Sequence, residues 1–349
     1  MKRRTEAEAV HGLYEVNVTL PGGLSMNEDA MFCGIMKDPC DDTGWLALAD
    51  WLDENDDDPR RGELVRLHRK LLGTCCEPEE HPERAGWQSR VVELLVAGVQ
   101  PCVPRRTLML PGGVAMKFAF VQPGSFLMGS NHPEAFDEEK PVHKVTLTKG
   151  YFVGVYPVTQ AQWAAVMGTH PSYFKGEKRP VEQVSWDDCQ EFCEKLGAGQ
   201  EPGLKVGLPT EAEWEWACRA GTTTEYHFGD TITTDLVNYN GKYSWNGSPE
   251  GKYREETTEV GSFPCNAWGL CDLHGNVWEW CQDAFDENFY QSSPTEDPIC
   301  NNVQENVRVL RGGSWIYDPR YCRAAYRYRY EPAIRGGDDL GFRVRFRLD

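Results

Sequence analysis

The chain has 349 residues, of which 40% are hydrophobic and 26% charged, so it has room for two or three domains with buried cores and is not a disordered tail. Its net charge of −18 argues against general nucleic-acid binding, because contacts to phosphates need clustered positive charge. No apolar run reaches the roughly 18 residues of a membrane span, and the opening MKRRTEAEAV lacks the apolar stretch of a signal peptide. The 13 cysteines form no CxxC pair, which indicates a reduced chain, so we expect a cytoplasmic protein with no membrane partner.

The first hundred residues are predicted to be helical. Segment 43–55 repeats its apolar residues at helical spacing, with Thr43 as its candidate N-cap. Pro59 suits the first turn of a second helix, and a third helix is predicted over 86–96. The acidic run at 53–61, DENDDDPRR, is predicted to be a solvated loop between the first two helices, because its acids lack the spacing of a calcium loop.

Short strands and turns replace this pattern from about residue 105. Three helices are predicted here from side chains that cap a first turn. They begin after Thr159, Ser185 and Thr210, each followed three residues later by a Gln, Asp or Glu that can bond back. After Gly221 the chain has no long periodic segment, so we expect loops, turns and short strands to its end.

Eight phrases of the chain stand in an order typical of one protein family. They are FVQPGSFLMGS, EKPVHKVTL, YPVTQAQWAAVMG, PVEQVSWDDCQEFC, LPTEAEWEWACRAG, GLCDLHGNVWEWCQD, RVLRGGSW and LGFRV. In this order they resemble the sulfatase-modifying-factor family, whose best-known member is the formylglycine-generating enzyme. The resemblance implies an α+β chain in which residues 105–349 form a loop-rich variant of the C-type-lectin fold, preceded by a small helical domain, residues 1–104.

The helical stretch GWLALADWLDENDDDPRRGELVRLHRKLL resembles a second family, the bacterial repeat-companion domain. That domain is typically fused to others and has no known chemistry. The resemblance implies that the N-terminal module docks onto a partner of its own or acts as a scaffold.

The first resemblance also bears on catalysis. Activity in the family depends on two cysteines after the GGS motif, which bind copper(I) as a pair of thiolates. The segment GGSWIYDPRYC places Tyr317 at the first cysteine and Cys322, the only retained one, at the second. A phenol cannot replace a soft thiolate ligand, so we expect neither copper binding nor formylglycine-generating activity. The eight histidines show neither HxxxH nor HxH spacing, so no histidine–metal centre is expected.

A structural calcium site is expected in the GNVWEW loop, again from the resemblance. Carrying over the family's pattern gives Asp272 and Glu279 as side-chain ligands, with Gly275 and Val277 as carbonyl donors. Oxygen ligands within one tight turn suit calcium. The alternative is that Glu279 and Asn276 only bond to the backbone of the loop.

The residues from Arg308 to Asp349 differ in charge from the rest. They include ten arginines, no lysine and five acids, a net charge of +5. In YRYRY at 326–330, a period of two would separate tyrosines from arginines. Tyrosine and arginine dominate binding surfaces. The predicted binding residues are Tyr317, Asp318, Arg320, Tyr321, Tyr326, Tyr328, Tyr330 and Glu331.

Two observations qualify this surface. Four arginines could instead be structural and pair with buried acids, namely Arg323, Arg327, Arg343 and Arg345. The layout of the segment also resembles the variable proteins of diversity-generating retroelements, some of which vary this region of the same lectin-like fold to bind different ligands.

The leading hypothesis is a non-catalytic display domain that binds a protein or small ligand through the Tyr/Arg-rich C-terminal surface. One alternative is a metal-dependent oxidoreductase of the same family with an altered active site. Another is a scaffold in a bacterial signalling or defence assembly. A stacking platform for nucleic acid would use the same residue types, but the charge of −18 argues against it.

Overall fold

The computed structural model describes residues 26–77, 81–198, 203–302 and 306–348. The first 25 residues of the predicted N-terminal module, which include the opening MKRRTEAEAV, lie outside these ranges. Within them, no helix is long and apolar enough to cross a membrane.

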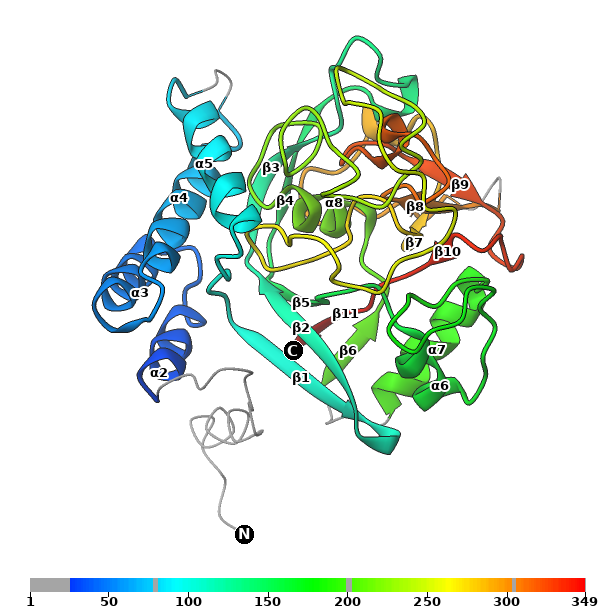
Figure 1. The fold of residues 1–349 in the computed structure, drawn as a ribbon, viewed down its shortest axis with the longest axis horizontal. Helices are drawn as coiled ribbons and strands as arrows, with labels where there is room; N and C mark the ends of the chain where they lie inside the picture. The colour runs from blue at the N-terminus through cyan, green and yellow to red at the C-terminus, as the bar shows by residue number, and fades with distance from the viewer. Residues whose placement is uncertain (1–25, 78–80, 199–202, 303–305, 349) are drawn as a thin grey trace.

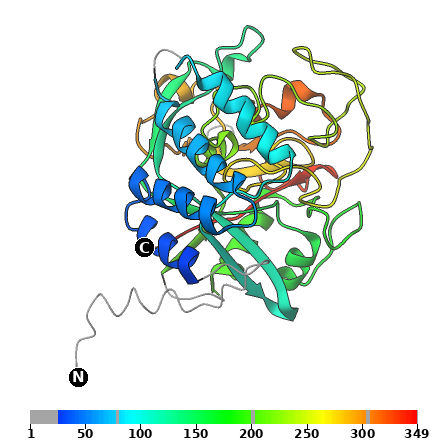
Figure 2. The same cartoon turned by 60° about the vertical axis from the view of Figure 1, so that its left-hand side comes forward.

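Four helices form an N-terminal helical layer along one flank of the molecule (Figures 1 and 2). They are α2 (Met26–Ile35), α3 (Asp42–Asn55), α4 (Arg60–Thr74) and α5 (Arg84–Val96). The predicted cap of α3 was wrong by two residues, because Asp41 occupies the N-cap and its carboxylate accepts from the backbone N–H of Thr43 at 3.1 Å. An aspartate at this position satisfies a free N–H of the first turn.

The helical layer shares its core with the rest of the chain. Leu71 of α4 and Leu94 of α5 belong to the same buried cluster as Trp216. Across this boundary, the His68 ring packs edge-on against Trp268 with centroids 4.3 Å apart. The predicted boundary at residues 104 and 105 therefore marks a change of secondary structure and not a gap in the core.

Arg84 adds polar contacts across the same boundary. It is 1% exposed, and its guanidinium donates to the carbonyl of Leu71 at 3.0 Å and to that of Gly221 beyond the layer. A buried arginine with carbonyl partners fixes geometry as well as filling space.

Three small sheets make up the remainder, joined by long ordered loops (Figure 1). The five-stranded sheet has the order β1-β2-β5-β11-β6, the four-stranded sheet β10-β7-β8-β9, and β3 pairs with β4. The strands are β1 (Arg105–Leu110), β2 (Val114–Val121), β3 (Gly124–Met128), β4 (His143–Leu147), β5 (Tyr151–Gly154), β6 (Leu204–Gly207), β7 (Trp278–Ala284), β8 (Arg308–Arg311), β9 (Tyr328–Tyr330), β10 (Leu340–Gly341) and β11 (Arg345–Leu348). The architecture is α+β and loop-rich, as predicted.

The three capped helices of this region are present. The predicted caps bond as expected, since Thr159, Ser185 and Thr210 each accept from a backbone N–H three residues later, at 3.1–3.3 Å. The helices are α6 (Gln160–Met167), α7 (Trp186–Ala198) and α8 (Glu211–Arg219).

Helix α8 lies between the sheets, and all nine of its residues are buried. Its Trp214 and Trp216 fill the core, whereas Glu211 and Glu215 bring two carboxylates to the same interior. Buried carboxylates need cationic partners, and the C-terminal segment supplies them.

Candidate binding surface

Strand β9 sorts its side chains by type. Tyr328 stacks on Trp278 with ring centroids 5.2 Å apart, and Tyr330 contacts Trp280 at 6.4 Å. Arg327 and Arg329 lie on the opposite side, both over Phe285, at 5.0 and 4.9 Å. The predicted period of two is confirmed, and it places the tyrosines on one face and the arginines on the other.

The four arginines for which a structural role was considered all pair with acids. Arg327 donates to both oxygens of Glu211 at 2.7 and 2.9 Å. Arg343 binds both oxygens of Glu279, each at 2.7 Å. The remaining pairs are Arg323 with Glu139 and Arg345 with Glu213. The first three arginines are completely buried, and Arg311 likewise pairs with Glu211 and Glu215 in the core, so a large part of the segment's positive charge neutralises interior acids and does not reach a partner.

Four half-buried tyrosines remain at the surface, and we call them the tyrosine surface: Tyr317, Tyr321, Tyr328 and Tyr330. The ring of Tyr317 contacts those of Trp278 and Tyr321, each at 5.3 Å, and that of Tyr328 at 6.3 Å. Burial and the neighbouring Tyr328 raise the pKa of the Tyr317 hydroxyl, so it remains a protonated donor at neutral pH. Rings stacked on buried tryptophans lose little entropy when a partner binds.

The prediction that Tyr326 is a binding residue is wrong, because its side chain lies beneath the surface and is only 5% exposed. Ala324 and Ala325 before it are buried, since their carbonyls accept from the Arg311 guanidinium inside the core. The chain therefore enters β9 from the interior, and the Tyr326 ring packs edge-on against Phe136 at 5.3 Å.

A short turn of 3₁₀ helix, Pro319–Cys322, presents Tyr321. Asp318 caps this turn, since its carboxylate accepts from the backbone N–H of Arg320 at 2.9 Å, and burial raises the pKa of this carboxyl group. Arg320 donates to the Glu134 carbonyl at 2.7 Å and lies over Phe136. Asp318 and Arg320, both predicted to bind a partner, therefore stabilise the turn that carries Tyr321 and project little from the tyrosine surface.

The rim of the tyrosine surface is charged. Glu331 is exposed directly after Tyr330 at the end of β9, whereas the exposed Arg329 lies on the opposite face of the strand. An aromatic centre with a charged rim is the usual composition of a protein interface.

The retained family cysteine lies in the core. Cys322 is completely buried, and burial raises the pKa of its thiol, which opposes formation of a thiolate. Its sulfur contacts the Asp318 carbonyl at 3.8 Å. Among the described residues, no three His, Cys, Asp or Glu side chains are grouped so that they could bind a metal.

The predicted calcium ligands fit a cation only in part. Asp272 fits, because its carboxylate is buried, one oxygen has no partner, and burial raises its pKa to about 6. Glu279 does not, because its oxygens accept from Arg343 and from the Trp214 indole N–H at 2.7 Å. Gly275 and Val277 are buried in the same turn. The calcium site therefore stays a prediction, and the alternative for Glu279 is also corrected, because it bonds to side chains and not to the loop backbone.

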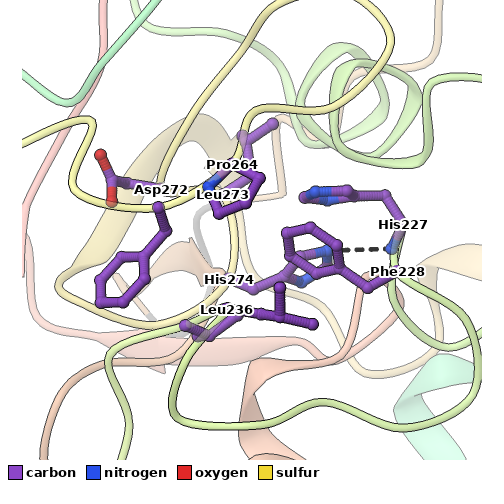
Figure 3. A pocket seen from close by; sticks show the side chains of 9 residues that line it. His227, Phe228, Leu236, Pro264, Asp272, Leu273 and His274 are labelled. Carbon is purple, nitrogen blue, oxygen red and sulfur yellow. Dashed lines mark hydrogen bonds between the residues drawn. The ribbon is translucent and has the colours of Figure 1, made fainter. Parts of the chain in front are cut away.

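A small pocket beside Asp272 contains two histidines that the sequence analysis did not single out (Figure 3). His274 accepts from the backbone N–H of His227 at 3.2 Å, and its other ring nitrogen bonds the Cys322 carbonyl at 2.7 Å. Burial lowers the pKa of His274 to about 4, so its ring is neutral. Neither ring nitrogen of His227 has a partner. Because the two histidines are 47 residues apart, no local spacing could reveal them.

These features define a loop-rich α+β domain of the lectin type that presents an aromatic surface beside a buried arginine–glutamate interior. The chain belongs to the family described as the sulfatase-modifying factor enzyme 1-like domain, whose model matches residues 113–347.

Relatives carry several names. The chain is 30% identical to a serine/threonine-protein kinase pkn1 of Chlamydia caviae, over 64% of this chain and 37% of that one. It is 35% identical to a formylglycine-generating enzyme of Streptomyces coelicolor, over 53% of this chain and 58% of that one. The chain spans less than half the length of the kinase-named relatives that it matches.

A solved structure, Treponema denticola variable protein 1, is also similar. It superposes with a TM-score of 0.57 and 29% identity, over 69% of this chain and 98% of that one. The likeness therefore extends over nearly all of that protein.

Proposed function

We propose that this protein is a non-catalytic display domain that binds a protein ligand through the tyrosine surface. The observation that carries the proposal is the division of the C-terminal segment, in which Arg311, Arg323, Arg327 and Arg343 pair with interior acids while the four tyrosines of the tyrosine surface stay accessible. Tyrosines supported by Trp278 supply contact area at low entropic cost. The likeness to a protein named as variable supports the same function, and diversification of the segment by a retroelement is its finer form.

The departure from the family's copper motif supports this proposal. A phenol at position 317 and a buried, protonated thiol at Cys322 leave no pair of thiolates for copper(I). The alternative, an oxidoreductase with altered metal chemistry, draws its support from the 35% identity to a formylglycine-generating enzyme.

The test of the tyrosine surface is partner capture with matched baits. The double variant Tyr328→Ala/Tyr330→Ala should lose the partners that the unaltered chain captures. Because both side chains are half-buried, we expect each change to cost no more than about 1 kcal/mol of stability. The control is Tyr173→Ala/Tyr243→Ala, which removes two more exposed tyrosines, at 65% and 58%, outside the segment. Equal capture by both variants would contradict the proposal.

A separate observation tests the finer form. A near-copy of the coding sequence for the segment from Arg308 onward, beside a reverse-transcriptase gene, is expected if the segment is diversified. The absence of such a copy would exclude diversification of the segment by a retroelement, but it would not bear on the proposed binding function. Repeating the capture with calcium chelated tests whether the predicted ion supports the surface.

A further inference from the structure

The geometry points to a disulfide-forming site at Cys265 and Cys271, two thiols that face each other across a tight turn. The inference concerns neither the tyrosine surface nor the family's copper cysteines. It rests on the backbone between the two residues and on their different accessibility.

The turn is defined by three hydrogen bonds. The N–H of Gly269 donates to the Asn266 carbonyl at 2.8 Å, which closes a β-turn, and Gly269 has a φ of 71°. The N–H of Asn266 then donates to the Leu270 carbonyl at 2.9 Å. The Asn266 side chain accepts from the N–H of Leu270 at 3.2 Å, so the turn is closed from inside.

The two arms continue side by side beyond this pair. Pro264 from one arm and Leu273 from the other both line the pocket shown in Figure 3. Because Asn266 and Leu270 form the hydrogen-bonded pair that closes the turn, Cys265 and Cys271 are the next residues outward and face each other across it. Opposite residues of this kind have Cα atoms about 4.5–5.5 Å apart, which is the separation that a disulfide requires. The two thiols also act on each other, since the Cys271 thiol lowers the pKa of Cys265 and the Cys265 thiol raises that of Cys271.

The two sulfurs differ in access. Cys265 is half-buried, whereas Cys271 is 8% exposed and belongs to the core. A soluble disulfide can therefore reach Cys265 first. The Cys265 thiolate attacks one sulfur of the soluble disulfide and releases one thiolate. The Cys271 thiolate then attacks the Cys265 sulfur of the mixed disulfide and releases the second thiolate. Two protein thiols are oxidised, and one soluble disulfide is reduced to two thiols.

The bridge would fix a turn that contacts the N-terminal helical layer. Trp268, at the tip of the turn, packs against His68 of α4. The Asn266 amide donates to the Ala217 carbonyl of α8 at 2.7 Å. The oxidised form should therefore resist thermal unfolding more than the reduced form, because the bridge constrains the unfolded chain.

The experiment is oxidation of the full chain with oxidised glutathione, followed by alkylation and mass spectrometry. We expect two fewer alkylatable thiols and, before alkylation, an intact mass about 2 Da lower than that of the reduced chain. Chymotrypsin cleaves after aromatic residues, so cleavage after Trp268 places the two cysteines on separate peptides, and a cross-linked pair identifies the bridge. The control Cys40→Ser removes an exposed thiol and should behave as the unaltered chain.

Cys265→Ser should keep all its remaining thiols under the same treatment, and its melting temperature reports whether it folds. Rates of alkylation in the unaltered chain give a second readout that needs no variant. After oxidation, neither the fast alkylation of Cys265 nor the slow alkylation of Cys271 should be detected. A mixed disulfide that persists on Cys265, an unchanged thiol count, or a bridge between other cysteines such as Cys75 and Cys76 would overturn the inference.

Discussion

The N-terminal helical layer and the C-terminal segment meet the same interior in opposite ways. The helical layer contributes apolar side chains such as Leu71 and keeps its charged run at 53–61 outside the core. The segment contributes charge, since Arg311, Arg323, Arg327 and Arg343 are all buried, and it leaves aromatic rings at the surface. Net charge therefore does not reveal which side chains of a segment are available to a partner.

The largest expected effect comes from removing one buried cation. Arg327→Met leaves Glu211 with fewer partners in a dry interior, and we expect a loss of about 4 kcal/mol in the free energy of unfolding. Arg329→Met, two residues further along the chain and exposed, should change stability by less than about 0.5 kcal/mol. Urea denaturation of both variants measures the difference in the free energy of unfolding. Equal losses would show that the buried and the exposed arginine do not differ in their contribution to stability.

The helical layer should unfold with the domain that it covers. Leu71→Ala creates a cavity at a completely buried site, with an expected cost of about 3 kcal/mol. Because the core is shared, calorimetry should show one transition that moves as a whole. The control is Leu46→Ala, which alters a side chain that is 43% exposed. A second transition that stays in place would show that the helical layer folds separately.

Acid should weaken the contact between the helical layer and the turn at Trp268. Burial lowers the pKa of His68 to about 3 in the folded chain, against about 6.5 when unfolded. A depressed folded pKa gives stability that is present above pH 6.5 and is lost as the pH falls toward 3. Between pH 7.5 and 5 the unaltered chain should lose about 2 kcal/mol relative to His68→Phe. For each chain, the change in the free energy of unfolding between the two pH values removes the constant effect of the substitution on packing. An equal change for both chains would contradict the assignment of the lowered pKa to His68.

The smallest expected effect concerns calcium. At calcium concentrations several times the dissociation constant, binding should stabilise the fold by about 1 kcal/mol, with the unpartnered Asp272 oxygen as the expected side-chain ligand. Asp272→Asn should abolish this shift in a thermal melt with and without chelator. An equal shift in that variant would assign the ion to other residues.

The sequence predicted the fold through local signals. The capping side chains Thr159, Ser185 and Thr210 act within one turn, so their positions are visible in the chain. The alternation in YRYRY was visible for the same reason. Both features are confirmed by the structure.

Long-range pairing could not be predicted. The partner of Arg327 is Glu211, 116 residues away, and that of Glu279 is Arg343, 64 residues away. The burial of Tyr326 follows from bonds between Arg311 and the preceding carbonyls, which no spacing reveals. The shared core of the helical layer was likewise hidden, since an amphipathic helix does not specify what covers its apolar face.

The proposed function requires that this domain binds a partner and does not oxidise cysteine. The most direct measurement is a copper(I) titration combined with oxygen consumption on a cysteine-containing peptide, with a formylglycine-generating enzyme as the positive control. With Tyr317 in place of a thiolate and Cys322 buried, we predict no oxygen consumption above the peptide alone and no tight copper binding. Tight copper binding together with turnover of the peptide would contradict the account.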